Sequence, residues 1–129
     1  MTLNELNKLK ENLEPARKLK AKINKKKMLA DSASPNMLGM PSSDVASKDA
    51  LILSYMDDEI ALTNLYNRII AANHKAFNYI MNIRDEQTQL IFRYRFINGY
   101  SWVKVAMELG GGNTDDSVRK RVDRYLQKN

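Results

Sequence analysis

The sequence predicts an all-α fold, a long helical hairpin or coiled scaffold followed by a C-terminal module of three short helices. Apolar residues recur at three- and four-residue intervals over most of the chain, which is the helical period. Glycine and proline gather at a few boundaries, and the 35 residues from Lys48 to Asn82 contain neither. At 129 residues the chain has material for one domain and an appendage.

Residues 1–30 are expected to form a basic amphipathic helix that is kinked, or begins afresh, near Pro15. Proline lacks a backbone donor and disfavours helical angles at the preceding Glu14. The segment carries nine Lys or Arg against three Glu, and we interpret its Lys25–Lys27 run as a solvated helix end. The apolar residues share one face of the helix: Leu6, Leu9, Leu13, Ala16 and Ile23.

Residues 31–47 are expected to be a linker or loop, because Ser, Pro, Gly and Asn replace the periodic pattern around Gly39-Met40-Pro41. Residues 48–83 predict a long central helix that acts as an oligomerisation scaffold, unless a break at Asn64, Asn67 or Asn73 divides it. A helix of this length has to pair with the first helix, with a second copy of the chain, or with both. One apolar seam runs through Leu62, Leu65, Ile69, Ala72, Ala76, Tyr79 and Ile83. A second row runs through Ile52, Met56, Ile60, Tyr66, Ile70, Phe77 and Ile80.

Residues 85–129 contain the start and stop signals of three short helices. The first ends at Asn98-Gly99, Ser101 caps the second, and Thr114 caps the third after the turn Gly110-Gly111-Gly112-Asn113. The expected inward residues are Leu90, Ile91, Tyr94 and Ile97 on the first, Trp102, Val105, Ala106 and Leu109 on the second, and Val118, Val122, Tyr125 and Leu126 on the third. We therefore predict a helix-turn-helix module over residues 85–129.

The third helix of this module is left with a basic outer face that suits duplex DNA. Arg and Lys pair with guanine edges in the major groove, and Ser and Gln can contact several bases. The predicted base-reading residues are Ser117, Lys120, Arg121, Arg124 and Gln127, beside Asp116. Lys104, Arg119 and Lys128 are the predicted phosphate contacts, and Thr114 completes the predicted DNA-binding set.

The residues of this region resemble a known family. The segments Asn98-Gly99-Tyr100-Ser101-Trp102, Val105–Gly110 and Asn113–Arg119 are similar to the C-terminal part of phage late-operon transcription regulators of the RinA and ArpU type. That part is itself similar to region 4 of bacterial sigma factors. The resemblance implies a sequence-specific double-stranded DNA-binding regulator of phage or prophage origin in the cytoplasm of a host bacterium, with bacterial RNA polymerase as a further candidate partner.

Composition narrows the remaining classes of function. The chain has no cysteine, one histidine (His74) and no apolar run long enough to span a membrane, so no cofactor, metal site or membrane partner is expected. No nucleophile has an adjacent base, so an enzyme is not expected. The net charge of +6 favours a polyanionic partner, and the heptad pattern favours a homodimer or higher homo-oligomer. Two alternatives stay open: a small terminase-like DNA-packaging component, and a protein-binding inhibitor of a host nucleic-acid enzyme.

Overall fold

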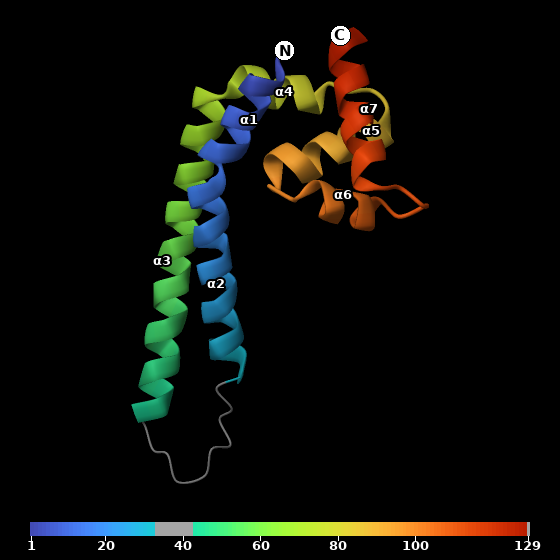
Figure 1. Ribbon diagram of the computed structural model, residues 1–129. Coiled ribbons are helices and arrows are strands. Elements are labelled where there is room, and N and C mark those ends of the chain that lie inside the picture. The colour runs from blue at the N-terminus through green and yellow to red at the C-terminus, as the bar shows by residue number, and fades with distance from the viewer. Residues whose placement is uncertain (33–42, 129) are drawn as a thin grey trace. The chain divides into compact units, whose positions relative to one another are not determined.

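Every regular element that the structure describes is a helix, which confirms the all-α prediction (Figure 1). The computed structural model describes residues 1–32 and 43–128. In chain order the elements are α1 (Leu3–Asn12), α2 (Glu14–Ser32), α3 (Ser43–Ala72), α4 (His74–Met81), α5 (Glu86–Phe92), the π-helical turn η1 (Arg93–Ile97), α6 (Trp102–Leu109) and α7 (Asp115–Lys128). They divide into two compact units, one of residues 15–67 and one of residues 1–14 with the chain from Arg68 onward.

The first of these units, residues 15–67, is an antiparallel hairpin of α2 and α3 (Figure 1). Ile23 and Ala30 are each 3% exposed and form its α2 seam. The Nζ of Lys26 lies 2.6 Å from Asp58 Oδ2, and Lys27 forms an ion pair with Glu59. The interpretation of Lys25–Lys27 as a solvated end is therefore wrong for Lys26, whose side chain is only 19% exposed, because acidic residues of α3 lie opposite it.

Several helix boundaries differ from the prediction. The helix α2 continues to Ser32 and α3 begins at Ser43, so the described ends of the expected loop 31–47 are helical, while Gly39-Met40-Pro41 lies outside the described residues. The chain also has a break at Leu13, so α1 and α2 are separate helices, with Pro15 in the first turn of α2.

The predicted central helix 48–83 is interrupted at Asn73. This residue has φ −120° and ψ 28°, and its side-chain amide donates to the carbonyl oxygen of Ile69 at 2.9 Å. A short polar side chain that bonds its neighbouring backbone competes with regular helix, so α4 begins afresh at His74. The break also disturbs the predicted seam: Ile69 and Ala76 are buried, but Ala72 at the end of α3 is exposed.

The second unit has a core that joins the N-terminus to the C-terminal helices. The helix α1 packs against α4 and η1 and buries Leu6 and Leu9 completely. Residues 1–14 thus belong to the same compact unit as the C-terminal helices, whereas the predicted segment 1–30 kept them together with the residues of α2. An aromatic cluster holds the centre, with the Phe92 ring 5.4 Å from that of Tyr125 and 5.6 Å from that of Phe96. This cluster connects α5 and η1 to α7.

Candidate nucleic-acid interface

The support for the candidate interface is the helix α5, which is fixed at its start by Asp85. The Asp85 carboxylate accepts a hydrogen bond from the backbone N–H of Thr88 at 3.0 Å and also one from the Thr88 hydroxyl. These two bonds hold the pKa of Asp85 below its ordinary value, and the bond from the Thr88 hydroxyl has the larger effect. The nearby charge of Arg121 lowers this pKa further. Thr88 is 5% exposed and is the one buried polar residue among those that the structure describes. Asp85 therefore caps α5 by accepting the hydrogen bond of an N–H in its first turn.

The turn η1 orients the start of α6 through Arg95. The guanidinium of Arg95 lies 4.4 Å from the centre of the Trp102 ring and donates to the backbone oxygen of Tyr100 at 3.0 Å. Burial lowers the pKa of Arg95. Gly99, with φ 74°, takes the left-handed position that the sequence predicted for the end of the preceding helix. A cation–π contact, a hydrogen bond and this turn thus set the direction of α6.

The turn between α6 and α7 has the predicted composition and caps. Ser101 is the N-cap of α6, and its hydroxyl accepts a hydrogen bond from the N–H of Lys104 at 3.2 Å. Gly110, Gly111 and Gly112 have φ of 69°, 63° and 76°, values that glycine adopts without strain. The N–H of Ser117 donates to the Thr114 hydroxyl at 3.1 Å, and the N–H of Thr114 donates to the Ser117 hydroxyl at 2.8 Å. This reciprocal bonding fixes the first residue of α7.

The helix α7 packs on α5 and α6 (Figure 1). The residues it buries there lie on one apolar face. Val118 is 1% exposed and Val122 is not exposed, while Tyr125 and Leu126 are half-buried, so the predicted inward set is confirmed. Ala106 of α6 is 5% exposed, and its small side chain permits the close approach of the two helices. Lys120, Arg124, Gln127 and Lys128 are exposed. The basic outer face of α7 is thus a property of the folded chain.

Three of the predicted contact cations on α7 form ion pairs. Asp116 lies 3.0 Å from Arg119 and 3.0 Å from Lys120, and hydrogen bonds from Lys120 and Arg119 lower its pKa. Arg121 donates to Asp85 at 2.9 Å and to Gln87 at 2.7 Å. The prediction that Arg121 points outward is thus corrected, because its side chain is drawn onto the start of α5 and is 37% exposed.

A cavity of about 460 Å³ lies along one flank of α7 and gathers part of the predicted set. Its lining residues are Thr88, Asn113, Ser117, Arg121, Arg124, Tyr125 and Lys128. Three of these are cations, and none of the described lining residues is acidic. Sequence reasoning missed Thr88 and Asn113, since the periodicity of α7 says nothing about which side chains of α5 and of the turn lie next to it. Asn113 is held by donating to the carbonyl of Gly110 at 2.6 Å.

The other predicted contact residues lie outside this cavity. Lys104 has its Nζ 4.1 Å from the centre of the Tyr100 ring. Arg119 and Lys120 lie with Asp116 on the other exposed side of α7, Gln127 is exposed, and Thr114 is used in the cap. Ser117, predicted to read bases, does line the cavity, but it is half-buried and its hydroxyl donates to the backbone oxygen of Thr114. Of the predicted contact cations, the cavity therefore gathers Arg121, Arg124 and Lys128.

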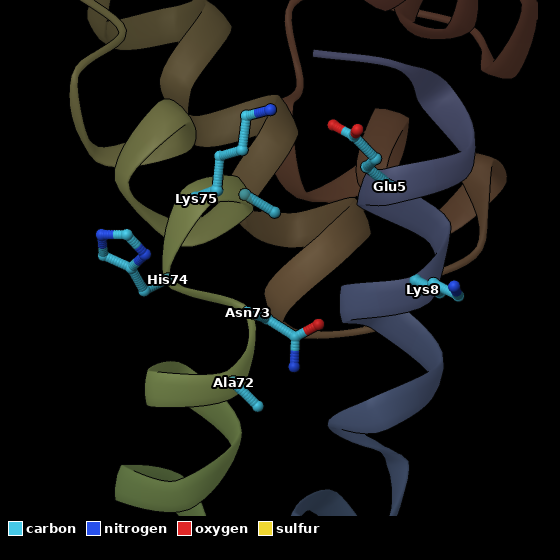
Figure 2. A pocket seen from close by; sticks show the side chains of 7 residues that line it. Glu5, Lys8, Ala72, Asn73, His74 and Lys75 are labelled. Atoms are coloured by element: carbon cyan, nitrogen blue, oxygen red, sulfur yellow. The ribbon is translucent and has the colours of Figure 1, made fainter.

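A second cavity, of about 210 Å³, lies between α1 and the start of α4 (Figure 2). It has mixed charge, with Glu5 and Lys8 from α1 and Lys75 from α4. His74 is exposed, and Figure 2 shows its imidazole turned away from Glu5 and Lys8. Among the described residues no cluster of three His, Cys, Asp or Glu side chains is placed to hold a metal ion. Nothing in this cavity favours one class of ligand.

No family model matches the sequence, and no curated protein or solved structure is significantly similar to it. None of the described helices combines the length and the apolar character that a membrane span needs.

Proposed function

We propose that this chain binds duplex DNA through α7 and regulates transcription in a sequence-specific manner, as the resemblance to phage late-operon regulators implies. The observation that carries the proposal is the basic flank of α7, where Arg124 and Lys128 are exposed along a cavity that Arg121, paired with Asp85, also lines. A bacterial cytoplasm is the proposed location, with the protein encoded by a phage or prophage.

The dimensions of α7 suit this role. Its 14 residues correspond to about 21 Å of helix, and the major groove of B-DNA, about 12 Å wide, admits a helix. Helix-turn-helix proteins join two helices by a tight turn and expose the second helix to the DNA. The pair α6 and α7 has this arrangement, with the basic side of α7 exposed. Of the exposed cations on α7, Arg124 and Lys128 belong to none of the ion pairs described above. Arg124 is the better candidate for base contact because its planar guanidinium can donate two parallel hydrogen bonds to a guanine edge.

The ion pairs around Asp116 and Asp85 influence how this surface binds. Exposed ion pairs exchange readily for contacts with other anions, so DNA phosphates can replace Asp116 as the partner of Arg119 and Lys120. Arg121 is different because Asp85 and Gln87 hold it from α5. We therefore assign Arg121 to positioning, Arg119, Lys120 and Lys128 to phosphates, and Arg124 to bases.

The test is fluorescence anisotropy with labelled duplexes of about 30 base pairs, one selected from a random library by binding and one unselected, in 50 and 200 mM salt. Arg124→Ala is expected to weaken binding to the selected duplex at least tenfold and to reduce its preference over the unselected one. Lys120→Ala is expected to weaken binding to both duplexes about equally and to lower the salt dependence by about one phosphate contact.

The controls replace exposed cations that are not on α7, with Arg68→Ala on α3 as the match for Arg124 and Lys25→Ala on α2 as the match for Lys120. Both are expected to change affinity less than threefold. If no variant of α7 binds differently from its control, or if the wild-type chain shows no salt-dependent affinity for any duplex, the proposal fails.

A protein contact is the second candidate function, because α6 exposes two apolar side chains one helical turn apart. Val103 is 58% exposed and Met107 is 76% exposed. We propose bacterial RNA polymerase as the partner, in keeping with the resemblance. Biolayer interferometry with the purified polymerase should then detect binding that Met107→Glu weakens and that Arg124→Ala does not. Equal binding by Met107→Glu and the wild type would exclude this surface.

A further inference from the structure

The α2–α3 hairpin separates its charges by helix. From Pro15 to Ala30, α2 has seven Lys or Arg and no acidic residue, and from Asp49 to Asn67, α3 has four acidic residues and no Lys or Arg. Within the chain, Asp58 accepts from Lys26 and Glu59 pairs with Lys27. Asp57 is exposed, as are lysines along α2 such as Lys20 and Lys22. One chain therefore presents an acidic helix and a basic helix on the same hairpin.

The exposed side of α3 also has an apolar stripe, defined here as Leu53, Met56 and Ile60. These side chains are 63%, 50% and 64% exposed, and Met56 and Ile60 belong to the second apolar row of the sequence, for which a second copy of the chain was one expected cover. Their spacing of three and four residues is that of a coiled-coil seam. Asp57 lies on the same face, four residues after Leu53 and three before Ile60. This face of α3 therefore combines apolar side chains with a carboxylate. Its complement is a helix that presents apolar side chains together with cations.

The helix α2 of this same chain has such a surface. Its exposed side chains include Met28 at 72% and Leu29 at 52%, and the long stems of its lysines can cover apolar area while their ammonium groups stay in water. Pairing α3 with a second α3 would bring the acidic residues of both copies together. Pairing α3 with a second α2 joins opposite charges.

We propose that two copies of this chain associate through their hairpins, so that the α3 stripe of each copy packs against α2 of the other. Each copy has both surfaces, so a twofold axis forms the contact between the α3 stripe and α2 twice in one dimer. This symmetric arrangement is the common one in homodimers. Three half-exposed side chains on each copy fall well short of the about 800 Å² per partner that a stable interface needs. The lysine stems must supply much of the rest, so the dimer is expected to dissociate at low concentration and to weaken in high salt.

This inference does not depend on DNA binding, and its test uses no DNA. Sedimentation velocity from 1 to 200 µM in 100 mM salt should show the wild-type chain passing from 14.8 kDa to twice that mass. Ile60→Lys is expected to weaken the association at least tenfold. Asp57→Lys is expected to weaken the association as well. Raising the salt concentration to 500 mM should also weaken the association of the wild-type chain.

Two matched variants serve as controls, because they make the same changes on exposed residues of the other unit. Met107→Lys on α6 controls for placing a lysine at an apolar site, and Asp123→Lys on α7 controls for charge reversal. Both should associate as the wild type does, and circular dichroism should show that every variant keeps its helix content. A wild-type chain that stays monomeric at 200 µM, an oligomer of more than two copies, or Ile60→Lys pairing as tightly as Met107→Lys would each overturn the proposal.

Discussion

Two valines on neighbouring helices allow the packing of α7 to be tested with a matched pair of substitutions. Val122 of α7 is completely buried, and Val103 of α6 is 58% exposed. Replacing either by alanine removes the same two carbon atoms and gives the same gain in helix propensity, at most about 0.7 kcal/mol. The difference between the two variants therefore isolates the burial of α7 on α5 and α6.

The size of this difference follows from the packing. Two buried carbon atoms contribute about 1.6 kcal/mol of transfer free energy, and the cavity that remains raises the cost of Val122→Ala to about 2–3 kcal/mol. Val103→Ala is expected to lie within about 0.5 kcal/mol of the wild type. With a urea m-value of about 2 kcal/mol/M, Val122→Ala should lower the unfolding midpoint by about 1–1.5 M, measured by circular dichroism. Equal midpoints for the two variants would refute the assignment of Val122 to the core.

Three further predictions concern the turn, η1 and the cap of α5. Gly110, with φ 69° and ψ −156°, lies in a region that is almost restricted to glycine, so Gly110→Ala should cost about 1–3 kcal/mol of stability in urea unfolding, although its Cβ would meet no atom within 4 Å. Arg95→Met should shift the fluorescence emission of Trp102, the single tryptophan, and unchanged emission would contradict the contact at 4.4 Å. Because hydrogen bonds from Thr88 depress the pKa of Asp85, its stabilisation is present above about pH 4 and is lost as pH falls through the depressed pKa. Urea midpoints measured from pH 6 to 2.5 should therefore fall less for Asp85→Asn than for the wild type, and parallel curves would exclude this role.

Local signals in the sequence predicted much of the C-terminal unit. The hydroxyl caps at Ser101 and Thr114 and the glycine turn depend only on residues that are close in sequence, so residue type and spacing are enough to find them. The inward set around Val118 and Val122 was predictable for the same reason, because a 3.6-residue period marks a buried face directly.

What the sequence did not predict depends on contacts between distant segments. Periodicity showed that Leu6 and Leu9 would be buried but not that α1 would pack against α4 and η1. It also gave no sign that Arg121 would be drawn to Asp85, which lies 36 residues earlier. An apolar period identifies a face that needs cover, and only the folded chain shows what covers it.

The most direct test of the central claim maps the surface of the chain that duplex DNA touches. In ¹⁵N–¹H correlation spectra recorded while a selected duplex is added, the largest shifts should fall on α7 and the cavity beside it, above all at Asn113, Arg124 and Lys128. Shifts confined to α2, or spread evenly over all exposed lysines, would contradict a reading role for α7.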